Sequence, residues 1–355
     1  MNKFTFTFLL LLLSNCQGTN EAFSQKKATK TSTLDKQKGA HLFGFRDSMN
    51  FQLLSQNNIE WVTLVPWGFQ FDYDSQVMNH HNGDSLRILR RDSSWIRRIK
   101  LVRSKGFKVF VKPHVWLDEP SAGKWRSDIA PVNDENWALW KASYRDFMLR
   151  YAKIAEQTQA EMFCIGTEFS KLSVNKPTFW KEIIQEVRTI YSGKITYAAN
   201  WYDEYEKITF WDDLDFIGIQ AYFPLVKNKN PTVQQISKGW NKYLSHMESI
   251  TKKYNRPILF TEMGYKSTAD SAIKPWEWID YSNRETKKES PETQANCYAA
   301  FFNTVWKKEW FAGVHIWQLR NDYESDRSER RRNRVHLDFT PQGKIAEGVI
   351  AKGFE

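Results

Sequence analysis

The chain is poor in the residues that build disulfide frameworks and metal centres. Its 355 residues include only 3 cysteines and 7 histidines. Apart from Cys16 only Cys164 and Cys297 remain, one in an apolar run and the other in a helical pattern, which indicates two buried thiols. The neighbouring His80 and His81 project in different directions, so they are poorly placed to share a metal ion. We therefore expect no disulfide framework, no metal site and no cofactor.

The chain also lacks an apolar run of the length that crosses a membrane, which is about 20 residues. Lys3 is followed by a short, mostly apolar run over residues 4–13 and then by Ser14, Asn15 and Cys16, an order typical of a secretory signal. Residues 1–16 look like a bacterial lipoprotein signal, in which the cysteine is lipidated after cleavage. An ordinary signal peptide with an incidental cysteine is the alternative. The first interpretation predicts an exported lipoprotein, periplasmic or on the cell surface, anchored to the membrane through Cys16.

Linker-like sequence is confined to one stretch near the amino terminus. Residues 17–40 are polar and rich in Lys, Thr, Ser and Gln, so they bury too little apolar surface to offset the entropy of ordering them. We expect a flexible tether there. No comparable stretch interrupts residues 41–355, and a composition that is 41% hydrophobic and 15% aromatic suffices for a large core. Residues 41–355 are therefore predicted to form one domain, and we expect a monomer.

Positive charge is in excess, but no nucleic-acid motif accompanies it. The formal net charge is +10, and 5 arginines crowd residues 327–334. A basic patch often binds nucleic acid, yet export argues against such a partner, and we expect none. A solvated loop is the simplest interpretation of the arginines, and contact with anionic lipid headgroups or an acidic glycan is the alternative.

From residue 41 onward, short apolar runs alternate with longer amphipathic stretches, a pattern typical of repeated βα units. Helical spacing recurs after Asp134 and Pro291 and around residues 86–102, 180–191 and 233–254, whereas residues 203–211 allow only a short helix. Strands are expected at residues 41–46, 59–66, 107–115, 162–166, 194–199, 216–221, 258–261 and 313–317. Because eight parallel strands close an α/β barrel, the predicted fold class is a single-domain (β/α)8 TIM barrel.

Two glutamates stand at the ends of predicted strands. Glu168 follows the fourth strand and Glu262 follows the seventh. The carboxyl ends of all strands in such a barrel open onto one face, where active sites lie. Strands four and seven lie across the barrel from one another, so the two side chains can converge over its centre. Two carboxyl groups there are the minimal equipment for cleaving a glycosidic bond, with surface or ion-paired glutamates as the alternative.

Other strand ends carry residues that suit this chemistry. Tyr222 follows the sixth strand, where its hydroxyl could orient an ionised Glu262. His114 ends the third strand, close enough in principle to touch Glu168 or a sugar hydroxyl, and a purely structural histidine is the alternative. Indole rings match the C–H faces of sugar rings. A carbohydrate cleft is therefore predicted by the tryptophans at four strand ends, which are Trp67, Trp116, Trp201 and Trp317.

Together these segments resemble glycoside hydrolase family 113, which belongs to the retaining (β/α)8 glycosidases of clan A. The resemblance runs from about Gly44 to the last strand and rests on Lys112-Pro113-His114-Val115-Trp116, Gly166-Thr167-Glu168-Phe169, Asn200-Trp201, Gly218-Ile219-Gln220-Ala221-Tyr222-Phe223, Thr261-Glu262-Met263-Gly264-Tyr265 and His315-Ile316-Trp317. It implies hydrolysis of β-1,4-mannans, with Glu168 as acid/base and Glu262 as nucleophile. Most clan A enzymes place Asn before the acid/base, where this chain has Thr167. Either Asn200 or another group then holds the sugar 2-hydroxyl, or that subsite is built differently.

The resulting hypothesis is a double displacement on β-1,4-mannan or manno-oligosaccharides. Retention requires carboxyl groups about 5–5.5 Å apart, whereas a separation beyond ~6.5 Å indicates inversion. Two alternatives stay open. The substrate could be another β-linked polysaccharide, such as β-glucan, a galactan or an acidic glycan, or the protein could be a glycan-binding lipoprotein without catalysis. Whether chain ends or mid-chain bonds are cut depends on the loops around the cleft.

Overall fold

The structure is a computed structural model of the chain, and it describes residues 35–45, 49–75, 85–280, 282–321 and 336–355. The predicted signal with Cys16, residues 17–34 of the predicted tether, His80 and His81, and the arginine cluster lie outside the described residues. Cys164 and Cys297 are both buried and free of disulfides. None of the described helices is long and apolar enough to cross a membrane.

Eight parallel strands close into a barrel, which confirms the predicted (β/α)8 fold. Almost all strand residues are buried, because barrel side chains cover one face of each strand and helices cover the other. Around the barrel the strands follow the order β1 (Gln37–Phe43), β10 (Phe311–Arg320), β9 (Ile258–Met263), β8 (Phe216–Gln220), β7 (Lys194–Asn200), β6 (Met162–Thr167), β4 (Lys108–Val111) and β2 (Trp61–Leu64).

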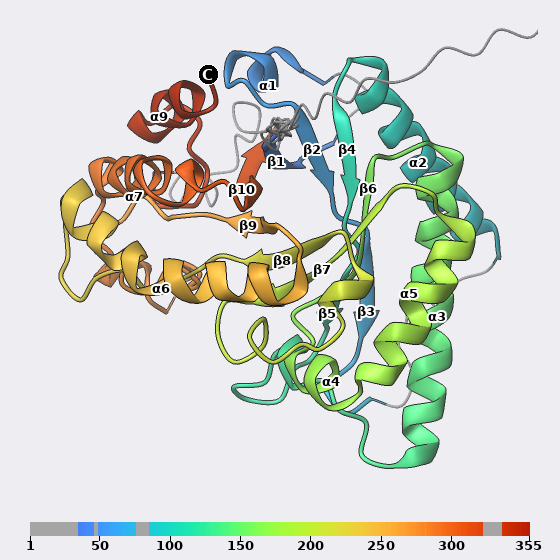
Figure 1. Cartoon of the computed structure of the whole chain (residues 1–355). Helices are drawn as coiled ribbons and strands as arrows, with labels where there is room; N and C mark the ends of the chain where they lie inside the picture. The colour runs from blue at the N-terminus through green and yellow to red at the C-terminus, as the bar shows by residue number, and fades with distance from the viewer. Residues whose placement is uncertain (1–34, 46–48, 76–84, 281, 322–335) are drawn as a thin grey trace, which may run out of the picture. The chain divides into compact units, whose positions relative to one another are not determined.

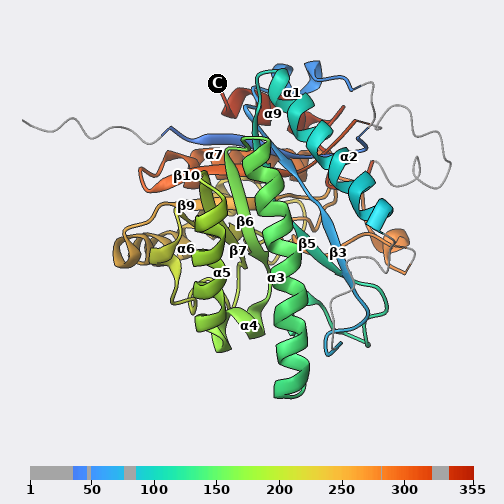
Figure 2. The ribbon, with the colours of Figure 1, turned by 90° about the vertical axis from the view of Figure 1, so that its right-hand side faces the viewer.

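Helices connect the strands and cover the barrel, with α6 and α7 on one side and α2, α3 and α5 on the other (Figure 1). Figure 2 shows α5, α3 and α2 in succession along the outside. The helices are α1 (Gln52–Gln56), α2 (Ser85–Ser104), α3 (Asp134–Gln157), α4 (Ser170–Asn175), α5 (Pro177–Ile190), α6 (Val233–Tyr254), α7 (Pro291–Asn303) and α9 (Ile345–Gly353). Between β7 and β8 there are only turns and the 3₁₀ helix η2 (Trp211–Asp213), as the weak helical pattern predicts.

Aromatic stripes on these helices form the core. On α3, Trp140, Tyr144, Phe147 and Tyr151 are all fully buried. The rings of Trp140 and Tyr144 stack at 4.8 Å with an interplanar angle of 11°. These buried aromatic residues therefore anchor α3 to the rest of the core.

Two short strands outside the barrel ladder depart from the prediction. β3 (Trp67–Gln70) and β5 (His114–Leu117) pair with each other in a separate two-stranded sheet. The sequence predicts one third strand over residues 107–115, but Pro113 has no N–H to donate to a ladder, so β4 ends at Val111 and β5 follows. Pro66 separates β2 from β3 in the same way. The β3–β5 pair carries Trp67, His114 and Trp116 beyond the end of the barrel.

The barrel also begins earlier than expected. β1 starts at Gln37, four residues before the predicted start, and its first residues pair in register with Gly313 and Val314 of β10. Lys36, just before the strand, donates from Nζ to the carbonyl oxygens of Lys308 (2.6 Å) and Phe311 (2.8 Å). The strand pairing of β1 and the side-chain bonds of Lys36 order a polar stretch whose own apolar content would not order it.

A polar cluster lies inside the barrel below the strand ends. His315 on β10 contacts Thr63 Oγ1 through Nδ1 (2.7 Å) and Gln37 Oε1 through Nε2 (2.9 Å). An amide oxygen only accepts, so the His315 proton is on Nε2 and Nδ1 accepts from the Thr63 hydroxyl. Burial lowers the pKa of His315 well below its usual value, so the neutral ring satisfies both partners.

Candidate active site

Glu262 lies near the end of β9, beside an irregularity in the ladder. The β8–β9 register shifts between Ile219 and Gln220, so that Gln220 pairs with Glu262. A shift of this kind bends a strand and changes the direction of its side chains. Glu262 is only 4% exposed. A carboxylate so well buried needs partners in the protein.

Two donors hold the two oxygens of Glu262. Tyr222 Oη donates to Oε2 at 2.8 Å, and Lys112 Nζ donates to Oε1 at 2.6 Å. Lys112 also donates to Gln220 Oε1 at 2.7 Å, which fixes the direction of the ammonium group. Burial and the neighbouring Glu262 raise the pKa of Tyr222 well above its usual value, so its hydroxyl stays protonated and continues to donate. Both oxygens of Glu262 are therefore fixed in position by donors from the protein.

Two neutral histidines complete this environment. The Nε2 atoms of His114 and His41 lie 3.6 and 3.7 Å from Glu262 Oε1. Burial, together with Lys112, lowers the pKa of both rings well below the usual value. Arg126 donates to His114 Nδ1 at 3.3 Å, so the single proton of His114 lies on Nε2 and faces Glu262. His114 thus contacts Glu262, not Glu168 as its strand end suggested, because Arg126 lies between His114 and Glu168.

Glu168 follows β6 directly and has an unusual backbone conformation. Its φ is +58°, in the left-handed region that costs a residue with a side chain about 1–3 kcal/mol. The β6–β7 register shifts between Cys164 and Thr167, just before this residue. Glu168 N donates to Ala198 O at 2.9 Å, so β7 still holds the turn. The strained turn places the Glu168 side chain at the mouth of the barrel, where it is 9% exposed.

Arg126 and Trp125 bind Glu168 from the loop after β5. Arg126 Nε lies 3.1 Å from Glu168 Oε2, and Trp125 Nε1 donates to the same oxygen at 3.4 Å. Arg126 is itself buried and donates to Val115 O at 3.2 Å. Because Arg126 contacts Glu168 while His114 contacts both Arg126 and Glu262, these two residues link the carboxylates. The site therefore holds two carboxylates in different surroundings, one beside an ammonium and a phenol and the other beside a guanidinium and an indole.

Aromatic rings from β3, β5 and the next loop form one side of the site. The Trp67 ring meets His114 edge-on at 5.1 Å and Trp116 at 5.8 Å. Trp116 in turn meets Trp125 at 5.4 Å, and it remains 41% exposed. This row of rings leads from the buried residues around the carboxylates to the exposed Trp116 at the surface.

A second aromatic group includes the other two predicted tryptophans. Trp201 stacks on Trp276 at 5.2 Å with an angle of 25°. Trp317 is only 6% exposed, because it packs against Phe43 at 5.1 Å and against Trp278 at 6.1 Å. Trp276 and Trp278 are 42% and 53% exposed and belong to the loop after β9, where the sequence shows no regular period. The exposed indoles on this side are thus two that the sequence did not single out.

The β9 loop, which we define as the described residues of 264–290, is held by a cluster of ion pairs. Lys266 is fully buried, lies 3.6 Å from Glu277 Oε2 and donates to Glu277 O at 2.7 Å. Lys287 pairs with Asp270 at 2.7 Å and also with Glu277. Burial lowers the pKa of Lys266 to about 8. These contacts fix the loop that carries Trp276 and Trp278.

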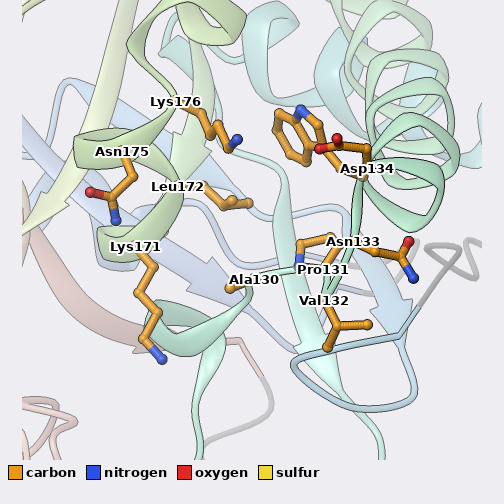
Figure 3. A pocket seen from close by; sticks show the side chains of 10 residues that line it. Ala130, Pro131, Val132, Asn133, Asp134, Lys171, Leu172, Asn175 and Lys176 are labelled. Atoms are coloured by element: carbon orange, nitrogen blue, oxygen red, sulfur yellow. The ribbon is translucent and has the colours of Figure 1, made fainter.

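A pocket of about 330 Å³ lies beside the site, between the segment that enters α3 and the helix α4 that follows Glu168 (Figure 3). Lys171 on its rim pairs with Asp128 at 3.1 Å, and the Nζ atoms of Lys141 and Lys176 lie 5.5 Å from the centre of the Trp137 ring. Neither carboxylate lines this pocket. Its lining residues are Ala130, Pro131, Val132, Asn133, Asp134, Trp137, Lys171, Leu172, Asn175 and Lys176.

Comparison with known families identifies the group to which this barrel belongs. The model of Glycoside Hydrolase Family 113 matches residues 43–344. The chain belongs to Glycoside Hydrolase Family 113. It is therefore a glycoside hydrolase, as the strand-end motifs imply. No curated protein matches the chain.

Solved structures agree with this membership of family 113. The chain is similar to a GH113 β-1,4-mannanase solved in a complex (25% identity, TM-score 0.73) and to a further GH113 β-1,4-mannanase structure (26%, 0.73), and each match covers 90% of this chain and 99% of the other. It is also similar to the GH113 β-mannanase AaManA from Alicyclobacillus acidocaldarius in complex with ManMIm (25%, 0.71, covering 90% and 97%).

Within this family-113 site, Thr167 is hidden from the substrate side. It is fully buried, and its hydroxyl lies 4.0 Å from Cys164 Sγ. After the register shift in β6, the Glu168 side chain keeps a small exposed surface, whereas Thr167 has none. Thr167 therefore presents no surface to a sugar 2-hydroxyl.

Asn200 is buried, and its amide donors are bound within the protein. Its Nδ2 donates to Glu204 Oε2 at 2.9 Å and to Ser170 Oγ at 2.8 Å, so both amide protons already have acceptors. The sequence could not show this, because Glu204 comes from a turn with no motif. The donors that do lie beside Glu168 belong to Trp125 and Arg126.

Nor does the described part of the chain contain a group of three His, Cys, Asp or Glu side chains arranged to hold a metal ion. The chemistry that the site can supply directly is acid, base and nucleophilic catalysis by its two carboxylates.

The sequence predicts no individual role for Lys112, yet in the structure it lies beside Glu262. Lys112→Met should lower the free energy of unfolding by about 3–5 kcal/mol, because it leaves the buried Glu262 carboxylate without its counter-charge. Combining it with Glu262→Gln should restore part of that loss, since no charge then stays unpaired. Urea unfolding of the single and double variants measures both effects.

The matched control for this cycle is Lys252→Met. Lys252 pairs with Glu248, but the two side chains are 75% and 45% exposed, so no measurable change in stability is expected. If the Lys112 variant were as stable as this control, the buried ion pair would not contribute to stability as described.

Proposed function

We propose that this glycoside hydrolase cleaves β-1,4-mannan or manno-oligosaccharides with retention of anomeric configuration. The observation that carries the proposal is the joining of two buried carboxylates, Glu168 and Glu262, by the Arg126–His114 link. The β-1,4-mannanases that the chain resembles at 25–26% identity support the substrate. The aromatic rings on both sides of the site support a polysaccharide ligand.

In the first step, Glu262 attacks the anomeric carbon while Glu168 donates a proton to the departing glycosidic oxygen. The bond from the anomeric carbon to that oxygen breaks as the bond to Glu262 forms. Lys112 and Tyr222 support this role, because their hydrogen bonds fix both oxygens of the Glu262 side chain in position. Both known contacts of Glu168 fall on Oε2, so we assign the proton transfer to Oε1.

In the second step, Glu168 is a carboxylate and accepts a proton from the water that attacks the glycosyl–enzyme bond. The same residue thus acts as acid and then as base. Arg126, at 3.1 Å, stabilises the carboxylate that remains after the first proton transfer. Water adds to the anomeric carbon on the face from which the leaving group departed, and Glu262 is released as a carboxylate.

The signal-like residues 1–16 extend the proposal to the location of the enzyme. We propose that the protein is exported and held at the membrane through a lipidated Cys16. Mannan fragments outside the cytoplasm would then be the substrates it meets.

The test is reducing-sugar release from soluble β-mannan, glucomannan and β-glucan, followed by ¹H NMR of the first product formed from mannohexaose. We expect mannan to be cut fastest and the β-anomer to appear first, since two displacements restore the starting configuration. Initial formation of the α-anomer would contradict the nucleophilic role of Glu262. Cleavage of β-glucan without cleavage of mannan would show that the substrate is β-glucan and would leave the proposed mechanism unchanged.

A further inference from the structure

A third buried carboxylate, Glu204, lies behind the residues that carry Glu168. It is fully buried in the turns that follow β7. Its Oε1 accepts from Tyr197 Oη (2.5 Å) and Ser173 Oγ (2.8 Å). Its Oε2 accepts from Asn200 N (2.7 Å), Asn200 Nδ2 (2.9 Å) and Ser170 Oγ (3.0 Å). Five donors saturate this carboxylate, whose two oxygens offer about four lone-pair sites.

These donors come from two elements that meet at the active site. Tyr197 and Asn200 belong to β7, whereas Ser170 and Ser173 belong to α4, which starts two residues after Glu168. Glu204 therefore ties α4 to β7. Because every contact is a donor, the charged carboxylate is the form that suits the site. Burial raises the pKa of Glu204, and the hydrogen bonds oppose that rise.

A relay connects Glu204 to the peptide next to Glu168. Phe169 N donates to Tyr197 Oη at 2.9 Å, and that hydroxyl donates its one hydrogen bond to Glu204. On the other side, Glu168 N donates to Ala198 O. The residue with φ +58° is thus held on both sides by β7, and one of the two anchors depends on Glu204.

We propose that Glu204 is a positioning residue that holds Glu168 in its strained conformation for proton transfer, through Tyr197 and α4. This rests on the proposed role of Glu168 as acid/base. Glu204 does not touch the substrate, since its oxygens are occupied by protein donors and it has no exposed surface.

A positioning role for Glu204 predicts a different kinetic result from a general loss of stability. Displacing Glu168 slows only the steps that need a proton moved. A 2,4-dinitrophenolate leaving group needs no acid, and azide attacks the glycosyl–enzyme without a base. Turnover of 2,4-dinitrophenyl β-mannobioside in azide should therefore survive a displaced Glu168, whereas hydrolysis of mannan should not.

The experiment compares Glu204→Gln and Tyr197→Phe with wild type on both substrates. Gln puts an NH₂ donor where only acceptors fit, and Phe removes the relay hydroxyl. For each variant we expect kcat on mannan to fall by about 10²-fold, the loss typical of a reacting group misplaced by about 1 Å. On the dinitrophenyl substrate with azide, rates should stay within about threefold of wild type. Equal losses on both substrates, or no loss on mannan, would overturn the proposal.

Tyr191→Phe is the matched control. Tyr191 is also a buried tyrosine, and its hydroxyl donates to Ala160 O at 2.6 Å, before the start of β6 and so at the opposite end from Glu168. Like Tyr197→Phe, this variant removes one buried hydroxyl, although that of Tyr191 donates one hydrogen bond whereas that of Tyr197 donates one and accepts one. Its activity on mannan should match wild type. A fall on mannan alone in this control would count against the special role of Tyr197.

A crystal structure of the Tyr197→Phe variant separates failure of this proposal from failure of the proposed function. If wild type cleaves no mannoside, the mannanase proposal fails, but the position of Glu168 can still be compared. We expect Glu168 to leave the left-handed region and to lose its contact with Arg126. An unchanged φ near +58° and an unchanged 3.1 Å contact would overturn the positioning role whatever the substrate.

Discussion

Glu262→Ala is expected to lower kcat/KM on β-mannan by at least about 10⁴-fold. The change removes the only atom group that we assign to attack the anomeric carbon. No neighbour can replace it, because Lys112 and Tyr222 reach the same place as protonated donors. Mannohexaose binding should persist, since the aromatic rings and the remaining polar groups are untouched. Steady-state kinetics and calorimetry measure the two quantities separately.

Two companion variants make this result interpretable. Glu262→Ala leaves the Lys112 ammonium without its carboxylate, so Glu262→Gln, which keeps an oxygen for the hydrogen bonds, should be equally inactive and more stable. Glu161→Gln is the control: Glu161 pairs with Arg103 at 2.9 Å just before β6, at the opposite end of the barrel. Its activity should equal that of wild type. Near-native turnover by either Glu262 variant would show that the nucleophile is a different residue.

The free energy of unfolding is expected to fall by roughly 6 kcal/mol between pH 7.5 and pH 5.0 from three buried histidines. His41, His114 and His315 have pKa values that burial lowers well below 6.5. In the unfolded chain each binds a proton as the pH falls below about 6.5, whereas in the folded chain it stays neutral. The unfolded state then binds more protons, so stability decreases with falling pH, by about 2 kcal/mol per histidine over this range.

Two carboxyl groups, one fully and one partly buried, act in the opposite direction. Burial raises the pKa of Glu204 and Asp338, so the folded state takes up their protons first and gains stability as the pH falls. The contribution of one histidine to the pH dependence of stability is therefore best isolated by comparing wild type with a variant that lacks it. His315→Asn should reduce the slope of stability against pH by about 0.8 kcal/mol per pH unit on average over this range, which is its share of about 2 kcal/mol spread over about 2.5 pH units. Urea unfolding at pH 7.5, 6.0 and 5.0 provides the slopes, and an identical slope in the variant would contradict the prediction.

The barrel could be predicted because its signal is repeated along the chain. Each strand is a short apolar run and each large helix has a clear apolar face. An error of a few residues in the predicted end of one element therefore does not change the predicted fold. The two glutamates could be located for the same reason, since Glu168 and Glu262 directly follow such runs. The β3–β5 pair was missed because Pro66 and Pro113 interrupt ladders whose flanking residues still look like one strand.

The partners of the carboxylates could not be found in this way. Lys112 lies inside an apolar run, where its position on the strand says nothing about an ion pair with a residue 150 positions away. Arg126 and Trp125 come from a loop without periodicity. Glu204 lies in a turn, and no sequence pattern predicts the five hydrogen bonds that its carboxylate accepts. These contacts arise from the closing of the barrel and are therefore visible only in three dimensions.

The ion-pair cluster of the β9 loop has a consequence for the surroundings in which the protein can work. The side chains of Lys266 and Lys287 are 0% and 8% exposed, and those of Asp270 and Glu277 are 21% and 28% exposed. Dissolved ions screen charges over about 8 Å at physiological ionic strength, but they act weakly on pairs that water does not reach. The loop that carries Trp276 and Trp278 should therefore keep its place in dilute and in salty media alike.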